Sequence, residues 1–197
     1  MANLIELANI ALSRVGADSI ESLDEATPQA RACKTHLPLA RDSALRSHDW
    51  GFARKEKALA LLNETSLRWA YVYQAPSDCL AARRLLNEST EDEGQKIPFE
   101  IGISDSGGSQ TILTNQEAAV LIYTAKISNP VLFDALFADA LAWWLASELA
   151  IPLRSKPDLQ VQLMKIAMSK SSHAQAVGSN EQHLVPQGNG SILDSRA

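Results

Sequence analysis

The feature that most constrains this chain is a long, almost wholly apolar run over residues 130–151. Asn129 suits the N-cap of a helix, Pro130 suits the first helical position, and Pro152 is expected to end the helix. A helix that is hydrophobic on every face normally lies at the centre of a core. Either the rest of the chain or neighbouring subunits must therefore enclose it, and the sequence points first toward assembly.

The same run is long enough to cross a membrane, but its acidic side chains argue against a span. Each would cost roughly 2.5–3.5 kcal/mol near the centre of a bilayer. They are Asp134, Asp139 and Glu148. We therefore expect no membrane span. The first residues are not a basic start followed by a clean apolar run, so we also expect no secretory leader.

The composition allows a sizeable core and limits the partners. The chain has 197 residues, of which 46% are hydrophobic, so it fits one domain carrying a subdomain. A net charge of -5 disfavours wholesale wrapping of nucleic acid, which rests on neutralising many phosphates. Cys33 and Cys79 are too few for a disulfide framework, and we expect them to be reduced, buried thiols.

Two kinds of periodicity divide the chain. Helical spacing of apolar residues covers 4–15, a segment from Thr27 to a break at 48–51, the run already described, and 157–178. Strict alternation covers 67–74, 97–103, 111–114 and 119–125 and predicts antiparallel strands. The predicted fold class is therefore α+β, a bundle of about four helices with a small antiparallel β subdomain inserted between the second and third helices.

The domain boundaries follow from these patterns. The bundle is expected over 1–51 and 128–178, and the β insert over 52–127. Residues 179–197 have no amphipathic period and are expected to form a flexible, extended C-terminal tail. Isolated apolar residues in this tail are candidate anchors on a partner. They are Leu184, Val185, Ile192 and Leu193.

Catalytic motifs are not recognisable in the sequence. There is no GxSxG elbow or reactive-cysteine signature. Gly107 and Gly108 lack the lysine and following helix of a phosphate-binding loop, so a hairpin turn is expected there. The histidines lack metal-ligand spacing. They are His36, His48, His173 and His183. We expect no catalytic, cofactor or metal site.

One segment has a charge opposite to that of the chain. Residues 31–57 carry seven Lys or Arg against three acids, a net of +4. This segment is either a solvated helix face or a surface for an acidic protein or passing DNA. For the second interpretation, the candidate contact residues are Arg41, Arg46, Trp50 and Phe52.

Three segments, 30–60, 69–80 and 121–153, together resemble the tail tubular protein A family, the head-to-tail adaptors of short-tailed bacteriophages. The resemblance extends over most of the chain, from residue 4 to about 177. Its most telling parts are Arg41-Asp42 leading into the DWGFA run at 49–53, the strand and turn from Trp69 to Asp78, and the Asn129-Pro130 start of the apolar run. None of these parts is a catalytic motif, and together they look like the signature of a structural protein.

The resemblance implies a virion protein that is not an enzyme and needs no cofactor. Assembled in the host cytoplasm, it would form a dodecameric ring between the portal protein and a tail nozzle protein similar to tail tubular protein B. Genomic DNA would pass through the lumen without sequence-specific binding. The helices would build the ring, the β insert would face outward or toward the tail, and the C-terminal segment would dock on the portal. An acidic balance suits a channel through which DNA must slide.

Two other function classes stay open at this point. The first is a virion-associated peptidoglycan hydrolase, with two acidic residues of the β insert as general acid and base. The second is a small regulator that binds nucleic acid through residues 31–57.

Overall fold

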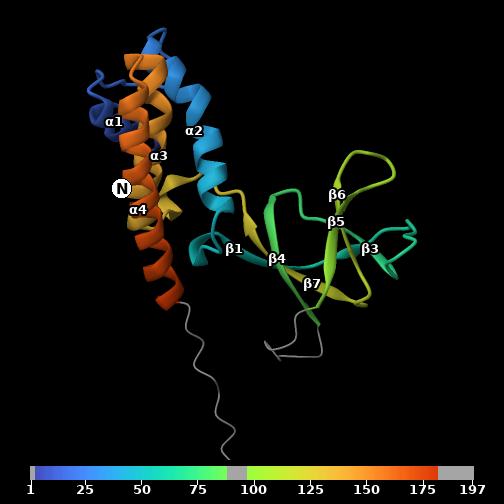
Figure 1. The fold of residues 1–197 in the computed structure, drawn as a ribbon. Coiled ribbons are helices and arrows are strands. Elements are labelled where there is room, and N and C mark those ends of the chain that lie inside the picture. Colours follow the sequence, from blue (N-terminus) through green and yellow to red (C-terminus); the bar gives the residue numbers. More distant parts are fainter. Residues whose placement is uncertain (1–2, 88–96, 182–197) are drawn as a thin grey trace, which may run out of the picture.

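The computed structural model describes residues 3–87 and 97–181 and confirms the α+β class (Figure 1). Within these residues, four α-helices form a bundle, and all the strands lie between the second and third helices. The helices are α1 (Leu4–Val15), α2 (Pro28–Arg46), α3 (Ala135–Arg154) and α4 (Pro157–Glu181). Short 3-10 turns, η1 (Gly51–Ala53) and η2 (Pro130–Leu132), lie where the chain enters and leaves the β subdomain.

The β subdomain contains two antiparallel sheets where we predicted one. The strands are β1 (Arg54–Ala58), β2 (Ala60–Leu61), β3 (Tyr71–Gln74), β4 (Cys79–Asn87), β5 (Phe99–Ile103), β6 (Gln110–Thr114) and β7 (Ala119–Ala125). The sheet β1-β7-β4 lies next to the bundle and the sheet β2-β3-β6-β5 lies farther away (Figure 1). Tyr73 and Ile112 of the far sheet share a core with Leu85, Leu121 and Tyr123 of the near sheet.

Local hydrogen bonds explain a difference in one predicted strand. Alternation predicted a strand over 67–74, but β3 begins at Tyr71. The Ser66 hydroxyl accepts from the backbone N–H groups of Arg68 and Trp69, and the Asn115 side chain accepts from the N–H of Ala70. These donors are satisfied by side chains and not by a neighbouring strand, so the segment forms a turn.

The prediction for the apolar helix is wrong at both ends. Asn129 caps only the short turn η2, and α3 begins after Asp134, whose carboxylate accepts from the N–H groups of Leu136 and Phe137. Pro152 does not end the helix, which continues to Arg154. A proline in the last turn removes few helical hydrogen bonds, and Arg154 Nε donates to the carbonyl of Val15, which anchors this end.

The chain itself encloses α3, so neighbouring subunits are not needed for that purpose. Helices α1, α2 and α4 all pack against α3, and side chains on several of its faces are buried, including Phe137, Leu141, Leu145 and Leu149. Among the described residues, α3 is the one helix long and apolar enough to cross a membrane by length and composition. Half of its most apolar stretch is buried inside the bundle.

The C-terminal tail begins later than predicted. Helix α4 continues past Gly178 to Glu181, so residues 179–181 are helical. The predicted anchors Leu184, Val185, Ile192 and Leu193 lie outside the described residues, and their contact with a portal stays a prediction.

Candidate functional site: a junction and a groove

A network of charged side chains joins the end of α2 to the β subdomain. The carboxylate of Asp42 lies 2.7 Å from the guanidinium of Arg41 and 2.8 Å from the ammonium of Lys126, which follows β7. Burial alone would raise the pKa of Asp42, but hydrogen bonds from Lys126 and Arg41 outweigh it and lower the pKa. The pair therefore holds the last strand against α2.

Arg83 on β4 makes the most extensive connection at this junction. Its guanidinium donates to the carbonyls of Arg46 at 3.0 Å and His48 at 2.5 Å, and more weakly to that of Leu45 at 3.4 Å. Its Nε donates to the Thr124 hydroxyl at 2.8 Å. A cation at the carbonyl end of a helix complements both the unpaired carbonyls and the helix dipole. Arg83 thus fixes the end of α2 on the near sheet.

Asp78 makes a second set of contacts within the near sheet. Its carboxylate lies 2.7 Å from the Lys55 ammonium and accepts from the Tyr123 hydroxyl at 2.9 Å. The hydrogen bond from Lys55 lowers the pKa of Asp78. Burial, together with the adjacent carboxylate, raises the pKa of Tyr123 to about 12, so the phenol stays protonated as a donor.

An aromatic cluster fills the space beneath the junction. Phe137 of α3 packs against Trp50, Phe52 and Phe133 with ring centroids 5.0–5.1 Å apart. The Trp50 indole donates to the carbonyl of Ala44 at 2.9 Å. Such contacts add to the free energy of burial and fix the direction in which the chain leaves α2.

The structure changes the interpretation of the four basic and aromatic candidates. Trp50 is 4% exposed and Arg41 is 8% exposed, so neither offers contact area on the described surface. Phe52 is half-buried in the aromatic cluster. Arg46 alone among the four is exposed, and it donates to the carbonyl of Leu80 at 2.6 Å. All four hold the junction together.

The basic segment is also less of a free cationic surface than its composition suggested. Several of its cations are paired with carboxylates at 2.7 Å. These pairs are Lys34–Asp24, Arg41–Asp42, Arg54–Asp49 and Lys55–Asp78. The pairing favours the structural interpretation of this segment.

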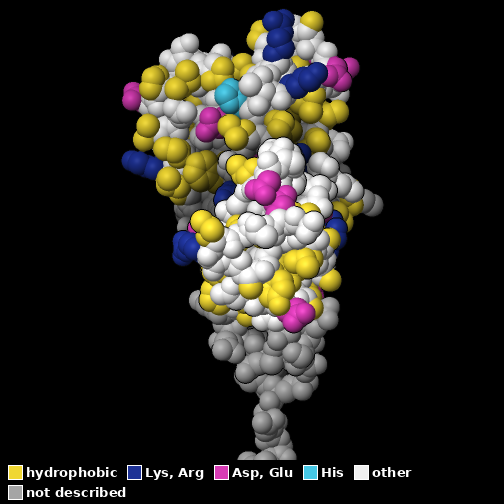
Figure 2. All heavy atoms as spheres, turned by 90° about the vertical axis from the view of Figure 1, so that its right-hand side faces the viewer, with side chains coloured by type: hydrophobic (Ala, Val, Ile, Leu, Met, Phe, Trp, Pro, Cys, Tyr) yellow, Lys and Arg dark blue, Asp and Glu magenta, His cyan; other side chains and the backbone are white. Residues whose placement is uncertain are grey.

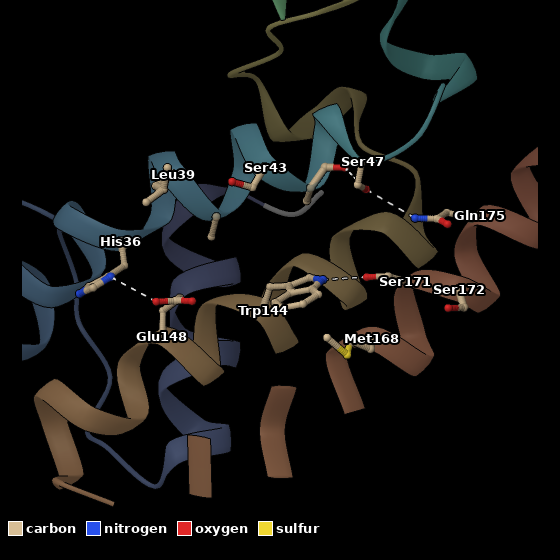
Figure 3. Close-up of a pocket in the computed structure, with 12 residues that line it drawn as sticks. His36, Leu39, Ser43, Ser47, Trp144, Glu148, Met168, Ser171, Ser172 and Gln175 are labelled. Atoms are coloured by element: carbon tan, nitrogen blue, oxygen red, sulfur yellow. Dashed lines mark hydrogen bonds and ion pairs between the residues drawn. The ribbon is translucent and has the colours of Figure 1, made fainter. Parts of the chain in front are cut away.

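A groove on the bundle was not expected from the sequence. It has a volume of about 490 Å³ and runs between α2 and α4 over α3 (Figure 3). Its lining is His36, Leu39, Ala40, Ser43, Ala44, Ser47, Trp144, Glu148, Met168, Ser171, Ser172 and Gln175. Trp144 forms part of the floor and donates to the Ser171 hydroxyl at 2.8 Å. Figure 2 shows hydrophobic side chains gathered over the bundle, above the β subdomain.

The chemistry of the groove is apolar with hydroxyl groups along its walls. Leu39 is 70% exposed on one side and Met168 is 52% exposed on the other. Glu148 is the one carboxylate in the lining, and its oxygen lies 3.9 Å from Nδ1 of His36. Exposed apolar side chains around a hollow are typical of an interaction site.

A second hollow, of about 410 Å³, lies on the other side of the C-terminal half of α4. Its lining includes Trp50, Phe52, Phe133 and Val177. A weak contact from the Gln175 amide to the Ser47 hydroxyl, at 3.5 Å, marks the end of the first groove nearest this hollow. Both hollows are lined in part by residues of the C-terminal half of α4.

The described residues do not gather into a metal site. Among residues 3–87 and 97–181, no group of three His, Cys, Asp or Glu side chains could hold a metal ion. Cys33 is buried, which raises its pKa to about 11 and leaves an unreactive thiol, whereas Cys79 is only partly buried. Gly107 has a φ of 71° in the turn between the paired strands β5 and β6, which confirms the predicted hairpin.

Comparison with known proteins adds no relative to this description. No protein-family model matches the chain, and no curated protein matches it significantly.

Proposed function

We propose that this protein is a structural adaptor of the head-to-tail connector of a short-tailed bacteriophage. Copies would form a ring, with twelve members as the resemblance implies, between the portal protein and the tail nozzle. The lumen would pass genomic DNA without sequence-specific contacts. The protein would be part of the virion and would perform no reaction.

The observation that carries the proposal is the position, in the structure, of residues on which the resemblance to the adaptor family rests. Arg41-Asp42, residues 49–53 and Asp78 are far apart in the sequence, yet they all contribute to the junction or to the near sheet beside it. Their contacts are ion pairs, hydrogen bonds and ring packing that position one part of the molecule on the other. The residues on which the resemblance to an adaptor family rests thus position one part of this molecule on the other, which supports a structural role.

A fixed junction suits an adaptor for a physical reason. A protein that connects two ring-shaped assemblies must present its two binding surfaces at a constant angle in every copy, because symmetric closure requires identical contacts. The bundle and the β subdomain lie side by side (Figure 1). Arg83 and the Asp42–Lys126 pair hold this arrangement at several points.

The test is assembly on a portal. The purified protein is mixed with the portal ring encoded by the same genome and imaged by electron microscopy. We expect a complex with a second ring beneath the portal and, after addition of the nozzle protein, a third layer. The nozzle protein should not bind the portal alone.

A junction variant sharpens this test. Asp42→Asn removes the carboxylate that holds Lys126 and should lower the yield of closed rings while leaving the bundle folded, as judged by circular dichroism. The matched control is Arg68→Ala, which removes an exposed ion pair between the Arg68 guanidinium and the Glu100 carboxylate, 3.8 Å apart. This control should assemble normally. Failure of the wild-type protein to bind the portal would overturn the proposal.

A further inference from the structure

Strand β5 is an edge of the far sheet that lacks the features which keep edge strands unpaired. Such features are charged side chains, short length and bulges. Within the described residues, each of the other three edges has one of them, because β1 is charged, β2 has two residues and β4 has two irregularities in its register. Strand β5 pairs with β6 over five consecutive residues without a shift, and Glu100 is its one charged residue. It is therefore the edge best suited to accept another strand.

The apolar side chains of β5 are only partly covered. Phe99, Ile101 and Ile103 alternate along the strand, so they share one face of the sheet. Ile101 lies directly opposite the buried Ile112, so this face is turned toward the core of the β subdomain. Nevertheless, Ile101 is 48% exposed and Ile103 is 73% exposed. A further strand beside β5 would extend the sheet at this edge and cover part of both side chains.

The open backbone groups of the edge belong to the same three apolar residues. The N–H of Ser104 donates to the carbonyl of Ser109, the residue directly opposite, at 2.9 Å. Along an antiparallel ladder, hydrogen-bonded and non-hydrogen-bonded pairs alternate. The backbone groups of Glu100 and Gly102 therefore point toward β6, and those of the three apolar residues point toward the open edge.

We propose that two copies of the free protein pair antiparallel through β5, so that their far sheets become one continuous sheet. The sequence of the strand, FEIGI, is complementary to itself about Ile101. With a two-fold axis beside Ile101, that residue faces its own copy and Phe99 faces Ile103. On the other face of the sheet, Glu100 faces Gly102, so no two carboxylates are directly opposite each other. Each apolar pair exchanges two N–H···O bonds.

The one charge on β5 is already compensated within each copy. The Glu100 carboxylate accepts from the Trp69 indole at 2.8 Å and lies 3.8 Å from the Arg68 guanidinium. In the proposed pair, the two Glu100 residues are diagonal neighbours, about 7–8 Å apart. The edge therefore presents its backbone and apolar side chains to a second copy without an unpaired charge between them.

The inference goes beyond the adaptor function and does not depend on it. A two-fold pair is closed and does not extend into a ring. Pairing through β5 is therefore a property of the protein before it meets a portal.

Sedimentation velocity over a range of concentrations measures the pairing. Ile103→Lys places a charge on the open edge, and Ile103→Pro removes an outward N–H while keeping an apolar side chain. Neither change removes a hydrogen bond to β6. The matched control is Leu39→Lys on α2, because Leu39 is 70% exposed and the variant gains the same charge. Circular dichroism verifies that each variant is folded.

Cysteine substitution tests the register. In the two-fold pair, the thiols of two Ile101→Cys copies are directly opposite each other. The thiols of two Ile103→Cys copies are four residues apart along the strands, roughly 13 Å, which is too far for a disulfide. The wild-type protein, which keeps Cys33 and Cys79, gives the background of covalent dimer on a non-reducing gel after mild oxidation.

We expect the wild-type protein and Leu39→Lys to show a concentration-dependent dimer, and each Ile103 variant to raise the Kd roughly tenfold or more. Ile101→Cys should form a covalent dimer, and Ile103→Cys should not exceed the wild-type background. A wild-type protein that stays monomeric overturns the inference, even if another protein binds β5. So does a dimer that the Ile103 variants do not weaken, or cross-linking that does not distinguish the two positions. None of these results bears on whether the protein binds a portal.

Discussion

Arg83→Ala should destabilise the protein more than an ordinary surface substitution, because this one side chain joins two parts of the fold. The change removes hydrogen bonds to the carbonyls of Leu45, Arg46 and His48 and to the Thr124 hydroxyl. Hydrogen bonds to a charged group contribute about 1.5–3 kcal/mol each. In the variant, water can replace the hydrogen bond to the exposed carbonyl of Arg46, and the lost contact to the carbonyl of Leu45 is weak at 3.4 Å. The expected loss is therefore about 2–4 kcal/mol.

Urea unfolding followed by tryptophan fluorescence and far-UV circular dichroism measures this loss. For an m-value of about 2 kcal/mol/M, the midpoint should fall by about 1–2 M. The matched control is Arg68→Ala, because the Arg68 side chain is 77% exposed and its ion pair should contribute less than about 1 kcal/mol. If the two variants lose similar free energy, the reasoning that Arg83 holds the junction is wrong. A separation of the fluorescence and dichroism transitions in Arg83→Ala would show that the two parts then unfold independently.

Two further substitutions test local packing and charge. Gly102→Ala should cost about 1–3 kcal/mol of unfolding free energy by urea titration, because the added Cβ would lie 2.7 Å from Leu113 Cδ1 and 2.9 Å from Thr111 Oγ1. Asp42 has a pKa below its ordinary value of 3.8, so its contribution to stability is present above that pH and is lost as the pH falls through the folded-state pKa. The difference in unfolding free energy between wild type and Asp42→Asn should therefore shrink from pH 5 to pH 2, and a constant difference would contradict the assignment of Lys126 as its partner.

Where local signals agree with each other, the sequence was sufficient to predict the fold. Helix α1 has a capping box formed by Asn3 and Glu6 and a left-handed Gly16 at its end, and its predicted bounds are those observed. Strand β7 is an uninterrupted run of mainly apolar residues that is buried almost throughout, and its bounds also match. In both cases the pattern of apolar residues and the residues at the ends point to the same element.

The missed strands lack a regular alternation for identifiable reasons. In β4 the register shifts between Cys79 and Ala81 and again between Ala82 and Arg84, so the residues facing one side do not keep a period of two. Strand β1 is an edge strand with charged side chains, which protect an edge from unwanted pairing but conceal the strand in the sequence. The second sheet could not be inferred without these two elements.

The junction and the groove depend on contacts between distant segments. Arg83 lies 35 positions or more from the carbonyls to which it donates, and no local pattern indicates this partnership. The groove requires α2 and α4 to lie on either side of α3, which the sequence of each helix does not specify. One signal was available, namely the second apolar stripe of Val161, Met164 and Met168 beside the core stripe of α4.

On the bundle, the surface that favours association with another molecule is therefore on α4 and not on α3. The sequence suggested that α3 needed other subunits, yet α1, α2 and α4 cover it, and its two adjacent tryptophans are both engaged within the chain. Trp143 lies under the Arg14 guanidinium at 4.0 Å, and Trp144 donates to Ser171. The outer stripe of α4, beside an open groove, is not covered by the described residues. A helix that completes the core on one side and exposes methionine and valine on the other is a surface where association with another molecule would remove apolar side chains from water.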